Sequence, residues 1–460
     1  MPANDRWKER LRFHGDGYFE MDLEDTGGVP VRLFLTPSLL EDLEDSILPQ
    51  IMTATTFPGV RLVVITPDVH HGYGVPVGCA IVSDPDTGAV ALGPVGFDIG
   101  CGMVSMRSDV PAGAATEQRR LAFNRAVMQR VSMGVGERGV SRLAGIDRPE
   151  FERLIRGGAD YYASRYGERI DRSRAERNCI PVDDRWQLPH SRADRGVTQL
   201  GSLGSGNHFI ELQRSEQTRT LYVQIHTGSR GFGHGLAEHY FQLARDEQPD
   251  VIHHLDEAWF SAESPRRREY LAAVAAGGNY AIINRLVIAE EVASAFRKIF
   301  KADLELVYEI SHNLVQREWH PELGWVNVHR KGATRAFPAG HPALAGTSWF
   351  DTGHPVLIPG SNRDWSYILR PTGSAKSAYT VNHGAGRRMS RSAARKHLHQ
   401  DEVDADYRAA GIVVNLDRRV PIDESGAAYK PSRDVVAAIT RAGLAEVEQR
   451  LWPLASLKGL

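Results

Sequence analysis

Cysteine is scarce in this sequence, and its scarcity excludes a disulfide-stapled fold. The 460 residues contain three cysteines, Cys79, Cys101 and Cys179. An odd and widely spaced set of this kind is not typical of a disulfide framework. The formal net charge is also small, at -2. The chain as a whole therefore does not indicate a nucleic acid or an acidic membrane as its partner. Any basic binding surface must therefore be local.

Long apolar runs are also missing from the sequence. The longest candidates, 61–67 and 78–82, have the length of buried strands and fall short of the roughly 18 residues that indicate a membrane span. The N-terminal stretch MPANDRWKERLRFHGDG is polar and charged, unlike a secretory signal. We therefore expect a cytoplasmic protein with no membrane contact, whose 42% hydrophobic residues suffice for a sizeable core.

The apolar pattern is typical of a mixed α/β fold, and the length of 460 residues allows two or three domains or one large domain. The segment 137–198 differs from the rest because it is rich in Arg, Asp and Glu and poor in large apolar residues. We expect it to be a polar, partly helical insertion or arm, solvated rather than part of the core. Strands are expected at 31–35, 61–67, 80–84, 220–229 and 304–311, and helices at 116–131, 147–170, 235–247, 268–299 and 434–449.

Short glycine-rich loops recur after the apolar runs. They read HHGYGVPVG, GFDIGCGM, GSLGSGNHF, HTGSRGFGH, SHNL and NHGAGRR, and each contains His, Asp, Asn or Cys. Loops at strand ends commonly hold functional residues, and glycine lets the backbone approach a ligand closely. We therefore expect a single deep site assembled from many loops.

Several of these loops together offer a mixed set of metal ligands. A single metal ion needs three or four protein ligands, whereas five ligands hold two ions if a thiolate bridges them. Two close cations are the usual clamp for in-line phosphoryl transfer. Cys and His favour zinc, and the carboxylate leaves manganese open. The candidate ligands are Asp98, Cys101, His208, His226 and His312.

A second feature is NHGAGRRMSRSAARK, residues 382–396. Small residues expose backbone N–H groups to an anion, and Arg387 and Arg388 add bidentate phosphate donors. A neutral His383 at this place could attack phosphorus, or it could be a spectator in a phosphate-binding loop. Further basic residues that could hold phosphate lie in VHRKGATRAFP and at Arg230.

The motifs together resemble the tRNA-splicing ligase RtcB family, the RNA 3′-phosphate/5′-hydroxyl ligases. PDVHHGYGVPVG, GFDIGCGM, GSLGSGNHFIEL, HTGSRG, SHN, HRKGATRAFP, PGS with SY, HGAGR and the terminal LKG occur in the family's order. The likeness runs from about residue 30 to the C-terminus and is weakest across 137–198. It implies a compact α/β fold of the α+β type, in a single domain spanning residues 1–460. It also implies a deep two-manganese site, with Zn²⁺ or Co²⁺ as alternatives, in which Cys101 bridges the ions.

The resemblance also implies roles for individual residues. His383 would carry GMP taken from GTP, Glu211 and Lys458 would face the base, and Tyr429 would lie near it. Arg230 and Arg387 would contact RNA phosphates. The remaining nucleotide contacts would be Asn207, Asn313, Ser361, Ser366, Ala385 and Gly386.

The implied reaction joins two RNA ends. A 2′,3′-cyclic phosphate would be opened to a 3′-phosphate, GMP would pass from His383 to that phosphate, and a 5′-hydroxyl would displace it. Positioned donors and two cations suit such steps. The implied partners are GTP, RNA with these ends and an activating helper protein, in a monomer or homodimer.

The chain departs from the family pattern at four places. Asn382 replaces the usual Cys, NRDW (362–365) replaces small residues, Cys79-Ala80 follows Gly78 where a Gly pair is usual, and AYKPSRD replaces AYKD. These changes favour a divergent bacterial paralogue used in RNA repair over a dedicated tRNA-splicing enzyme. Two other functions fit the ligand set: a metal-dependent RNA-end phosphoesterase, and an RNA-end-binding paralogue without turnover.

Overall fold

The computed structural model describes residues 6–134, 143, 145–167, 169–171 and 179–459. Within these residues, one sheet has seven strands in the order β1-β2-β3-β4-β5-β13-β12. Its β3–β4 pairing is parallel and the others are antiparallel. Its strands are β1 (Arg12–His14), β2 (Tyr18–Glu20), β3 (Val31–Leu33), β4 (Val60–His70), β5 (Val77–Ser83), β12 (Asn313–His320) and β13 (Gly324–Lys331).

A second sheet in the described residues has the order β11-β7-β9-β8-β19-β16-β15, with β18 paired to β19. Two small pairs, β6–β10 and β14–β17, complete the strands described. The bounds are β7 (Gly102–Pro111), β8 (Phe209–Ser215), β9 (Thr220–Thr227), β11 (Glu305–Ser311), β15 (Val356–Ile358), β16 (Ser366–Pro371), β18 (Val413–Val414), β19 (Ala445–Leu457), β6 (Val90–Ala91), β10 (Trp259–Phe260), β14 (Ala333–Arg335) and β17 (Thr380–Asn382).

Between β11 and β12 the chain passes from the second large sheet to the first through a single residue. β11 of the second sheet ends at Ser311 and β12 of the first begins at Asn313, so His312 lies at the junction. Strand ends from both sheets therefore meet beside His312. This crossing places the functional loops at the border between the sheets.

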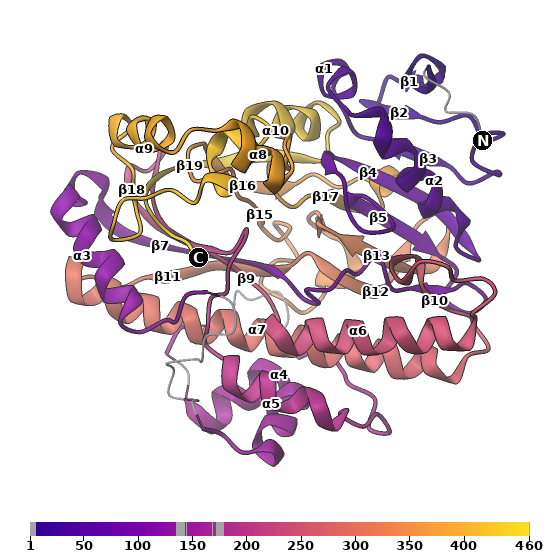
Figure 1. Ribbon diagram of the computed structural model, residues 1–460, viewed down its shortest axis with the longest axis horizontal. Coiled ribbons are helices and arrows are strands. Elements are labelled where there is room, and N and C mark those ends of the chain that lie inside the picture. Colours follow the sequence, from indigo (N-terminus) through magenta and orange to yellow (C-terminus); the bar gives the residue numbers. More distant parts are fainter. Residues whose placement is uncertain (1–5, 135–142, 144, 168, 172–178, 460) are drawn as a thin grey trace.

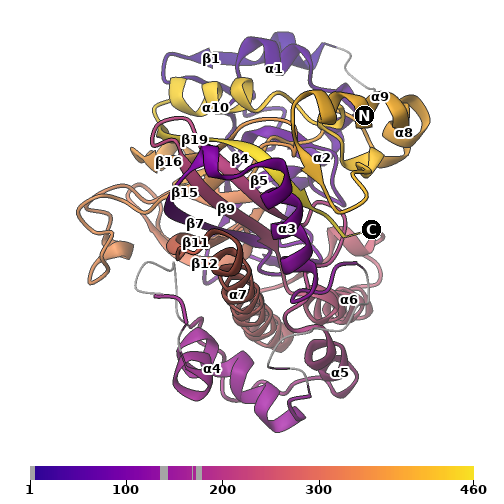
Figure 2. The same cartoon turned by 90° about the vertical axis from the view of Figure 1, so that its left-hand side faces the viewer.

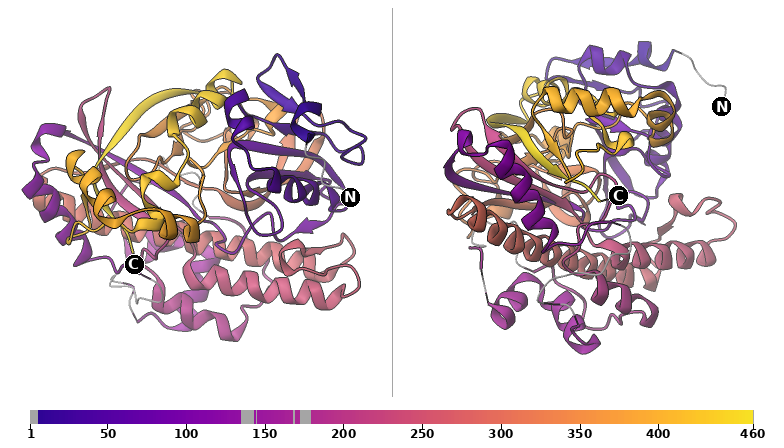
Figure 3. Two further views of the ribbon diagram at one scale, coloured as in Figure 1. Left: turned by 45° about the horizontal axis from the view of Figure 1, so that its top comes forward. Right: turned by 60° about the vertical axis from the view of Figure 1, so that its left-hand side comes forward.

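Helices cover the sheets on two sides (Figure 1). α7 runs beneath the strands beside α6, with α4 and α5 below them (Figure 2). The N-terminal strands and the last part of the chain lie on the opposite side (Figure 3). The bounds are α1 (Pro37–Glu41), α2 (Leu48–Thr56), α3 (Glu117–Met128), α4 (Arg148–Tyr166), α5 (His190–Gln199), α6 (Arg230–Glu247), α7 (Pro265–Phe300), α8 (Arg391–His397), α9 (Gln400–Ala409) and α10 (Ser432–Arg441).

α7 is the central helix of the molecule. Ser264 caps its start by accepting a hydrogen bond from the Arg266 N–H, Pro265 occupies the first turn, and Lys301 ends it in the left-handed region at φ 61°. The helix holds an 18-residue window apolar enough to span a membrane, which the expectation of no such run overlooked. Because 94% of that window is buried inside the protein, α7 is a core helix.

The described residues form seven apolar clusters, and three of them pack helices on α7 or on the sheets. One joins α4, α6 and α7 through Phe151, Phe232 and Tyr280. A second packs α3 and α7 on the second sheet, and a third packs α2 on the first sheet. Burial of this apolar surface, at about 25 cal/mol per Å², is the main force that fixes the strand ends in place.

The structure confirms the expected strands and most of the expected helices. The helix expected at 434–449 is wrong in its last part, because α10 ends at Arg441 and β19 starts at Ala445. Gly443, at φ +63°, makes the turn between them, and pairing with β8 and β16 overrides local helix propensity.

The polar segment 137–198 is more buried than its composition predicts. In α4, Phe151, Leu154, Ile155 and Tyr162 are buried against the core, so a solvated arm is wrong for this helix. Residues 137–142, 144, 168 and 172–178 of the segment lie outside the described residues. Widely spaced apolar residues on one helix face made the buried stripe hard to see among many charges.

Candidate active site

The five candidate metal ligands lie at the ends of four neighbouring strands. Asp98 and Cys101 precede β7, His208 precedes β8, His226 is near the end of β9, and His312 follows β11. The order β11-β7-β9-β8 makes these strands adjacent. In the ladder, Gly102 pairs with both Ser311 and Thr227, and Phe209 pairs with His226. Strand register therefore brings all five side chains to one edge.

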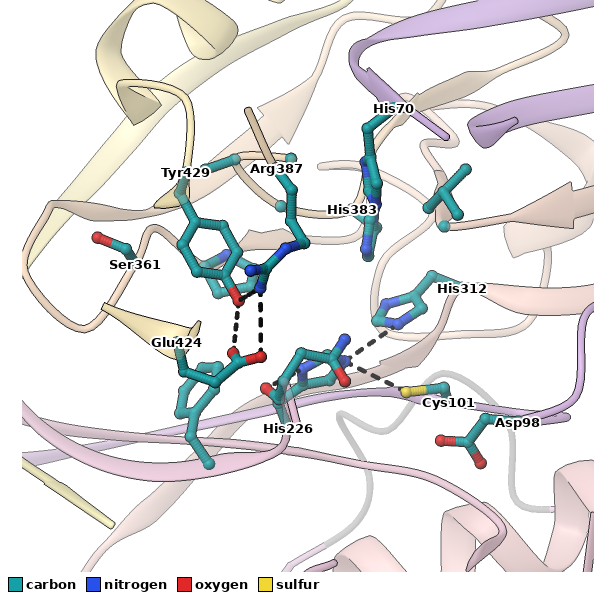
Figure 4. A pocket seen from close by; sticks show the side chains of 18 of the residues that line it. His70, Asp98, Cys101, His226, His312, Ser361, His383, Arg387, Glu424 and Tyr429 are labelled. Atoms are coloured by element: carbon teal, nitrogen blue, oxygen red, sulfur yellow. Dashed lines mark hydrogen bonds and ion pairs between the residues drawn. The ribbon is translucent and has the colours of Figure 1, made fainter. Parts of the chain in front are cut away.

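The ligand atoms form two overlapping groups. Figure 4 shows four of the five residues, Asp98, Cys101, His226 and His312. Cys101, His226 and His312 make one group, and Asp98, Cys101 and His208 make the other. Cys101 Sγ lies 3.2 Å from His226 Nε2 and 3.6 Å from His208 Nε2. His226 Nε2 lies 3.2 Å from His312 Nε2, and His208 Nε2 lies 3.0 Å from Asp98 Oδ2. Cys101 belongs to both groups, as a bridging thiolate would.

Backbone carbonyls orient two of the imidazoles. His208 Nδ1 lies 2.9 Å from Leu203 O, and His226 Nδ1 lies 3.1 Å from Asn207 O. A carbonyl can only accept, so each Nδ1 carries a proton and each Nε2 points into the cluster. This arrangement is the usual support for a metal-binding histidine. The donor set of imidazole nitrogen, thiol and carboxylate therefore fits one or two transition-metal ions.

Burial sets the protonation tendencies of the cluster. It lowers the pKa of His226 and His312 well below the usual value, and it raises the pKa of the Cys101 thiol well above its own, with help from Asp98. Burial also opposes ionisation of Asp98, but the hydrogen bond and charge of His208, together with the charge of Arg230, outweigh it and lower the pKa of that carboxyl. Neutral imidazoles are the form that binds metal.

Two adjacent polar residues of α7 tie the ligand-bearing segments together. Arg285 is fully buried and donates to Gly100 O (2.6 Å), Thr227 O (3.2 Å) and Ser311 Oγ (2.7 Å). Each acceptor residue is the chain neighbour of a ligand: Cys101, His226 or His312. Arg285 is also paired with the buried carboxylate of Glu309.

Asn284 extends this support to the remaining segment. Its Oδ1 accepts from Gly201 N (2.7 Å), and its Nδ2 donates to Ser202 O (3.2 Å) and Gly228 O (3.1 Å). The first two residues belong to the loop that carries His208. Asn284 and Arg285 thus fix all four ligand segments to one helix, and nothing in the apolar pattern of α7 marked them as site residues.

His383 faces the metal cluster from another loop. It follows β17, and its ring lies 4.8 Å from the His312 ring, centroid to centroid. Its Nδ1 lies 2.7 Å from Asp68 Oδ2, which also accepts from the backbone N–H of His383 (3.1 Å) and Gly384 (3.2 Å). Burial opposes the ionisation of Asp68, but His383 outweighs it and lowers the pKa of this carboxyl. An ionised Asp68 only accepts, so it holds the proton on Nδ1 and leaves Nε2 as the free lone pair.

Sequence reasoning gave Asp68 no role. It lies in the PDVHHGYGVPVG motif, 315 residues before His383, within a β4 stretch where the pairing with β5 is irregular. The only available signal was a carboxylate next to a glycine-rich loop. Its partner could not be identified without the tertiary structure.

A cavity of about 370 Å³ joins the metal ligands to the expected nucleotide residues. It also contains Glu424, Arg391, Tyr73 and Phe97, for which no role was expected. Three expected residues, His208, Ser366 and Arg230, are not part of its lining. The predicted residues that do line it are Asp98, Cys101, Asn207, Glu211, His226, His312, Asn313, Ser361, His383, Ala385, Gly386, Arg387, Tyr429 and Lys458.

The three absent residues lie just outside the cavity. His208 stands behind it in the ligand cluster. Ser366 is buried beneath it, where its Oγ accepts from Gly360 N (3.1 Å) and Gln213 Nε2 (3.1 Å). Arg230, at φ 54°, reaches Ser202 Oγ and Gly134 O, both at 3.4 Å. Direct contact of Ser366 with a nucleotide in the cavity is thus not supported by its place in this structure.

Charged side chains form the end of the cavity that lies away from the candidate metal ligands. Glu424 contacts Tyr429 OH (2.5 Å), Lys458 Nζ (3.1 Å) and Arg387 Nη1 (3.2 Å), as Figure 4 shows for Tyr429 and Arg387. Burial opposes ionisation of Glu424, but Lys458 leads the partners that lower its pKa. Burial raises the pKa of the nearby Glu211 to about 7, although Gln213 Nε2 donates to it at 2.7 Å.

The unusual residues of the chain mostly point away from the cavity. Asn382 is buried, and its Nδ2 donates to Gly384 O at 2.7 Å. Arg363 pairs with Asp406 (2.9 and 3.0 Å), and Trp365 packs on Trp452 with ring centroids 5.0 Å apart. Of the NRDW stretch, Asn362 alone lines the cavity among the described residues. These departures therefore change the supports of the pocket more than its wall.

The fold and the site together define a class of protein. Ligands of the kind that bind transition metals are buried at the strand ends of an α/β fold, beside a histidine held by a carboxylate. Basic residues line the same cavity. This combination suits an enzyme of phosphoryl transfer.

Comparison with known proteins narrows the class to a family. A family model described as tRNA-splicing ligase RtcB matches residues 50–459, so the chain belongs to the RtcB family and the resemblance seen in its motifs is confirmed. The RNA-splicing ligase RtcB of Mycobacterium tuberculosis is 37% identical over 438 residues, covering 89% of this chain and 100% of that protein. The tRNA-splicing ligases RtcB of Nanoarchaeum equitans and Thermococcus kodakarensis are each 33% identical, over 96% and 94% of this chain and 98% and 95% of their own lengths. These relatives support an RNA ligase function.

Proposed function

We propose that this protein is a GTP- and Mn²⁺-dependent RNA ligase. It joins an RNA end bearing a 2′,3′-cyclic phosphate or 3′-phosphate to a 5′-hydroxyl end, in RNA repair or tRNA splicing. The observation that carries the proposal is the pairing of Asp68 with His383 in the same cavity as the five-ligand cluster. A phosphoesterase would need the cluster but would have no use for a histidine held in this way.

His383 acts as the nucleophile. Its Nε2 lone pair attacks the α-phosphorus of GTP, a nitrogen–phosphorus bond forms, and pyrophosphate leaves with the electrons of the broken bond. Asp68 holds the Nδ1 proton and stabilises the positive charge that develops on the ring. Buried and already hydrogen-bonded, Asp68 needs no rearrangement for this role.

The later steps pass GMP to RNA and then release it. A 3′-phosphate oxygen attacks the phosphorus of the adduct and frees His383. The 5′-hydroxyl oxygen then attacks the 3′-phosphorus, loses its proton, and displaces GMP. Each step exchanges one bond to phosphorus for another, so positioned charge is the main catalytic requirement.

Asp98, Cys101, His208, His226 and His312 would hold the metal ions, with Zn²⁺ or Co²⁺ as alternatives to Mn²⁺. When bound, the ions would neutralise phosphate charge. Glu211 and Lys458 would recognise the base, and Asn207, Asn313, Ser361, Ala385 and Gly386 would contact the rest of the nucleotide. Ser366 would act indirectly, through the Gly360 turn and Gln213.

Arg387 and Arg230 remain the proposed RNA-phosphate contacts. Arg387 lines the cavity, but its guanidinium is held by Glu424, Asp423 O (2.6 Å) and Met389 O (3.0 Å). It would therefore present a fixed charge to the phosphate. Cytoplasmic location, an activating helper protein and a monomer or homodimer complete the proposal.

The proposal is tested by incubating the protein with α-labelled GTP and Mn²⁺. The expected result is an acid-labile protein–GMP adduct that is absent in His383→Ala. Ligation of RNA with 2′,3′-cyclic-phosphate and 5′-hydroxyl ends follows as the second assay. An adduct that persists in His383→Ala would contradict the proposal, and cyclic-phosphate opening without an adduct would identify a phosphoesterase instead.

A further inference from the structure

An exposed aromatic ring stands at the cavity. Tyr73 lines it, yet 69% of this residue is exposed. A single exposed aromatic residue is ordinary on a protein surface. Tyr73 differs because it combines exposure with a place in the catalytic cavity and a rigidly held backbone.

The loop that carries Tyr73 is fixed on both sides. The Gln50 amide makes two bonds to Gly72: its Nε2 donates to Gly72 O (2.7 Å), and its Oε1 accepts from Gly72 N (3.0 Å). Lys331 Nζ donates to Tyr73 O and to Val75 O (3.0 Å). Lys331 is itself buried. The ring is thus presented from a preorganised turn, which lowers the entropy cost of binding.

The ring lies at the metal-ligand end of the cavity. Tyr73 meets Phe97 edge to face, with centroids 5.9 Å apart at 90°. Phe97 is anchored by a stacked contact with Phe241 at 5.0 Å, and the next residue along the chain is the candidate ligand Asp98. Tyr73 and Phe97 therefore form a small aromatic surface beside the place where a substrate phosphate would be held.

We propose that Tyr73 stacks on the base of the RNA nucleotide that carries the 3′-phosphate. This inference rests on the proposed ligase function. Nucleobases are planar, and exposed tyrosine rings bind unpaired bases by stacking without regard to sequence. His70, Asp98 and Lys331 line the same cavity as Tyr73 and Phe97, and a polar cavity of this kind suits a nucleotide better than an apolar protein segment.

The test uses a short RNA whose last nucleotide is 2-aminopurine with a 3′-phosphate. Stacking quenches its fluorescence, which is read with Mn²⁺ and without GTP. Wild type and Tyr73→Phe should quench it, and Tyr73→Ala should not, with the dissociation constant raised about tenfold. Phe13→Ala is the matched control, because Phe13 is 56% exposed and lies outside the cavity lining.

GMP loading distinguishes the inference from the proposed function. All four proteins should form the adduct equally, because Tyr73 is assigned to RNA alone. Undiminished quenching and affinity in Tyr73→Ala would overturn the inference, as would quenching of a 5′-hydroxyl probe in place of the 3′-phosphate probe. Loss of GMP loading in Tyr73→Ala would assign the residue to the structure of the loop. A wild type that forms no adduct would refute the ligase proposal, whatever the fluorescence shows.

Discussion

The two ends of the cavity are built in different ways. At the metal end, adjacent strands deliver the ligands, and Asn284 and Arg285 fix their backbones from one helix. The end around Glu424, where we propose that the nucleotide binds, is called the nucleotide end. Loops from distant parts of the chain meet there, and a charge network around Glu424 holds them. Backbone pairing between strands fixes the metal end, whereas contacts between side chains fix the nucleotide end. The two ends should therefore respond differently to mutation.

The largest expected effect comes from the ligand shared by both metal groups. Cys101→Ser should reduce metal content and GMP loading together, each by more than about 100-fold, because loss of a direct ligand exceeds the 10- to 100-fold cost of losing a supporting residue. Metal analysis of the purified protein and the labelled-GTP assay measure the two effects. Normal metal content together with normal adduct formation in this variant would refute the bridging role.

Asp68→Asn should impair the nucleophile His383 and leave metal binding unchanged. The Asn amide can donate a hydrogen bond to Nδ1 and so favour the tautomer that carries its proton on Nε2. GMP loading should therefore fall by about 10²- to 10⁴-fold. Metal content should stay at the wild-type level, because Asp68 contacts His383 and Thr66 rather than the ligand cluster. An unchanged rate of adduct formation would show that Asp68 serves the fold alone.

Arg285→Met should test whether the metal end is fixed by α7. Removing the guanidinium leaves the buried Glu309 carboxylate without its charged partner. This should lower the free energy of unfolding by about 3–5 kcal/mol. Metal affinity should fall by about 10- to 100-fold. Denaturant unfolding of the metal-free protein and Co²⁺ titration by absorption spectroscopy measure these separately.

The double variant Arg285→Met/Glu309→Met is the control for this prediction. Replacing both charges with apolar side chains of similar size should restore most of the stability. It cannot restore the hydrogen bonds to Gly100, Thr227 and Ser311. Wild-type Co²⁺ affinity in the double variant would limit Arg285 to a role in stability.

Glu211 should give the nucleotide end a pH dependence. Burial raises its pKa to about 7, and only the ionised carboxylate offers an acceptor oxygen to each of two guanine N–H groups. GTP affinity should therefore rise with pH up to about 7, by about tenfold per pH unit below it, and then level off. Calorimetry across this range checks the profile, and Glu211→Gln should bind weakly with no such rise. A wild-type profile without the rise would exclude Glu211 as the base acceptor.

The smallest effect is expected from the residues that depart from the family pattern. Arg363→Ala removes an exposed ion pair with Asp406, and such pairs contribute about 0–1 kcal/mol to stability. GMP loading should change by less than about twofold, because Arg363 does not line the cavity. A larger loss in the adduct assay would show that the supports of the nucleotide end control its chemistry.

The sequence predicted which candidate metal ligands the structure brings together, because the relevant signal is local. Cys101, His226 and His312 lie in or beside strands whose alternation and length are readable, and strand register converts that pattern into proximity. At the nucleotide end, Ser366 was placed from a motif, but its hydroxyl bonds to Gly360 and Gln213 beneath the cavity. A spacing that matches a family cannot show which way a side chain points.

The sequence by itself was enough to predict the family, the fold class and the five candidate metal ligands that the structure brings together. Tertiary structure alone decided that Asp68 holds His383, that Asn284 and Arg285 support four separate loops, and that Tyr73 stands exposed at the cavity. The physical reason is distance along the chain. Apolar periodicity and glycine-rich turns are local, whereas buried hydrogen bonds join residues hundreds of positions apart, wherever packing leaves a polar group that must be satisfied.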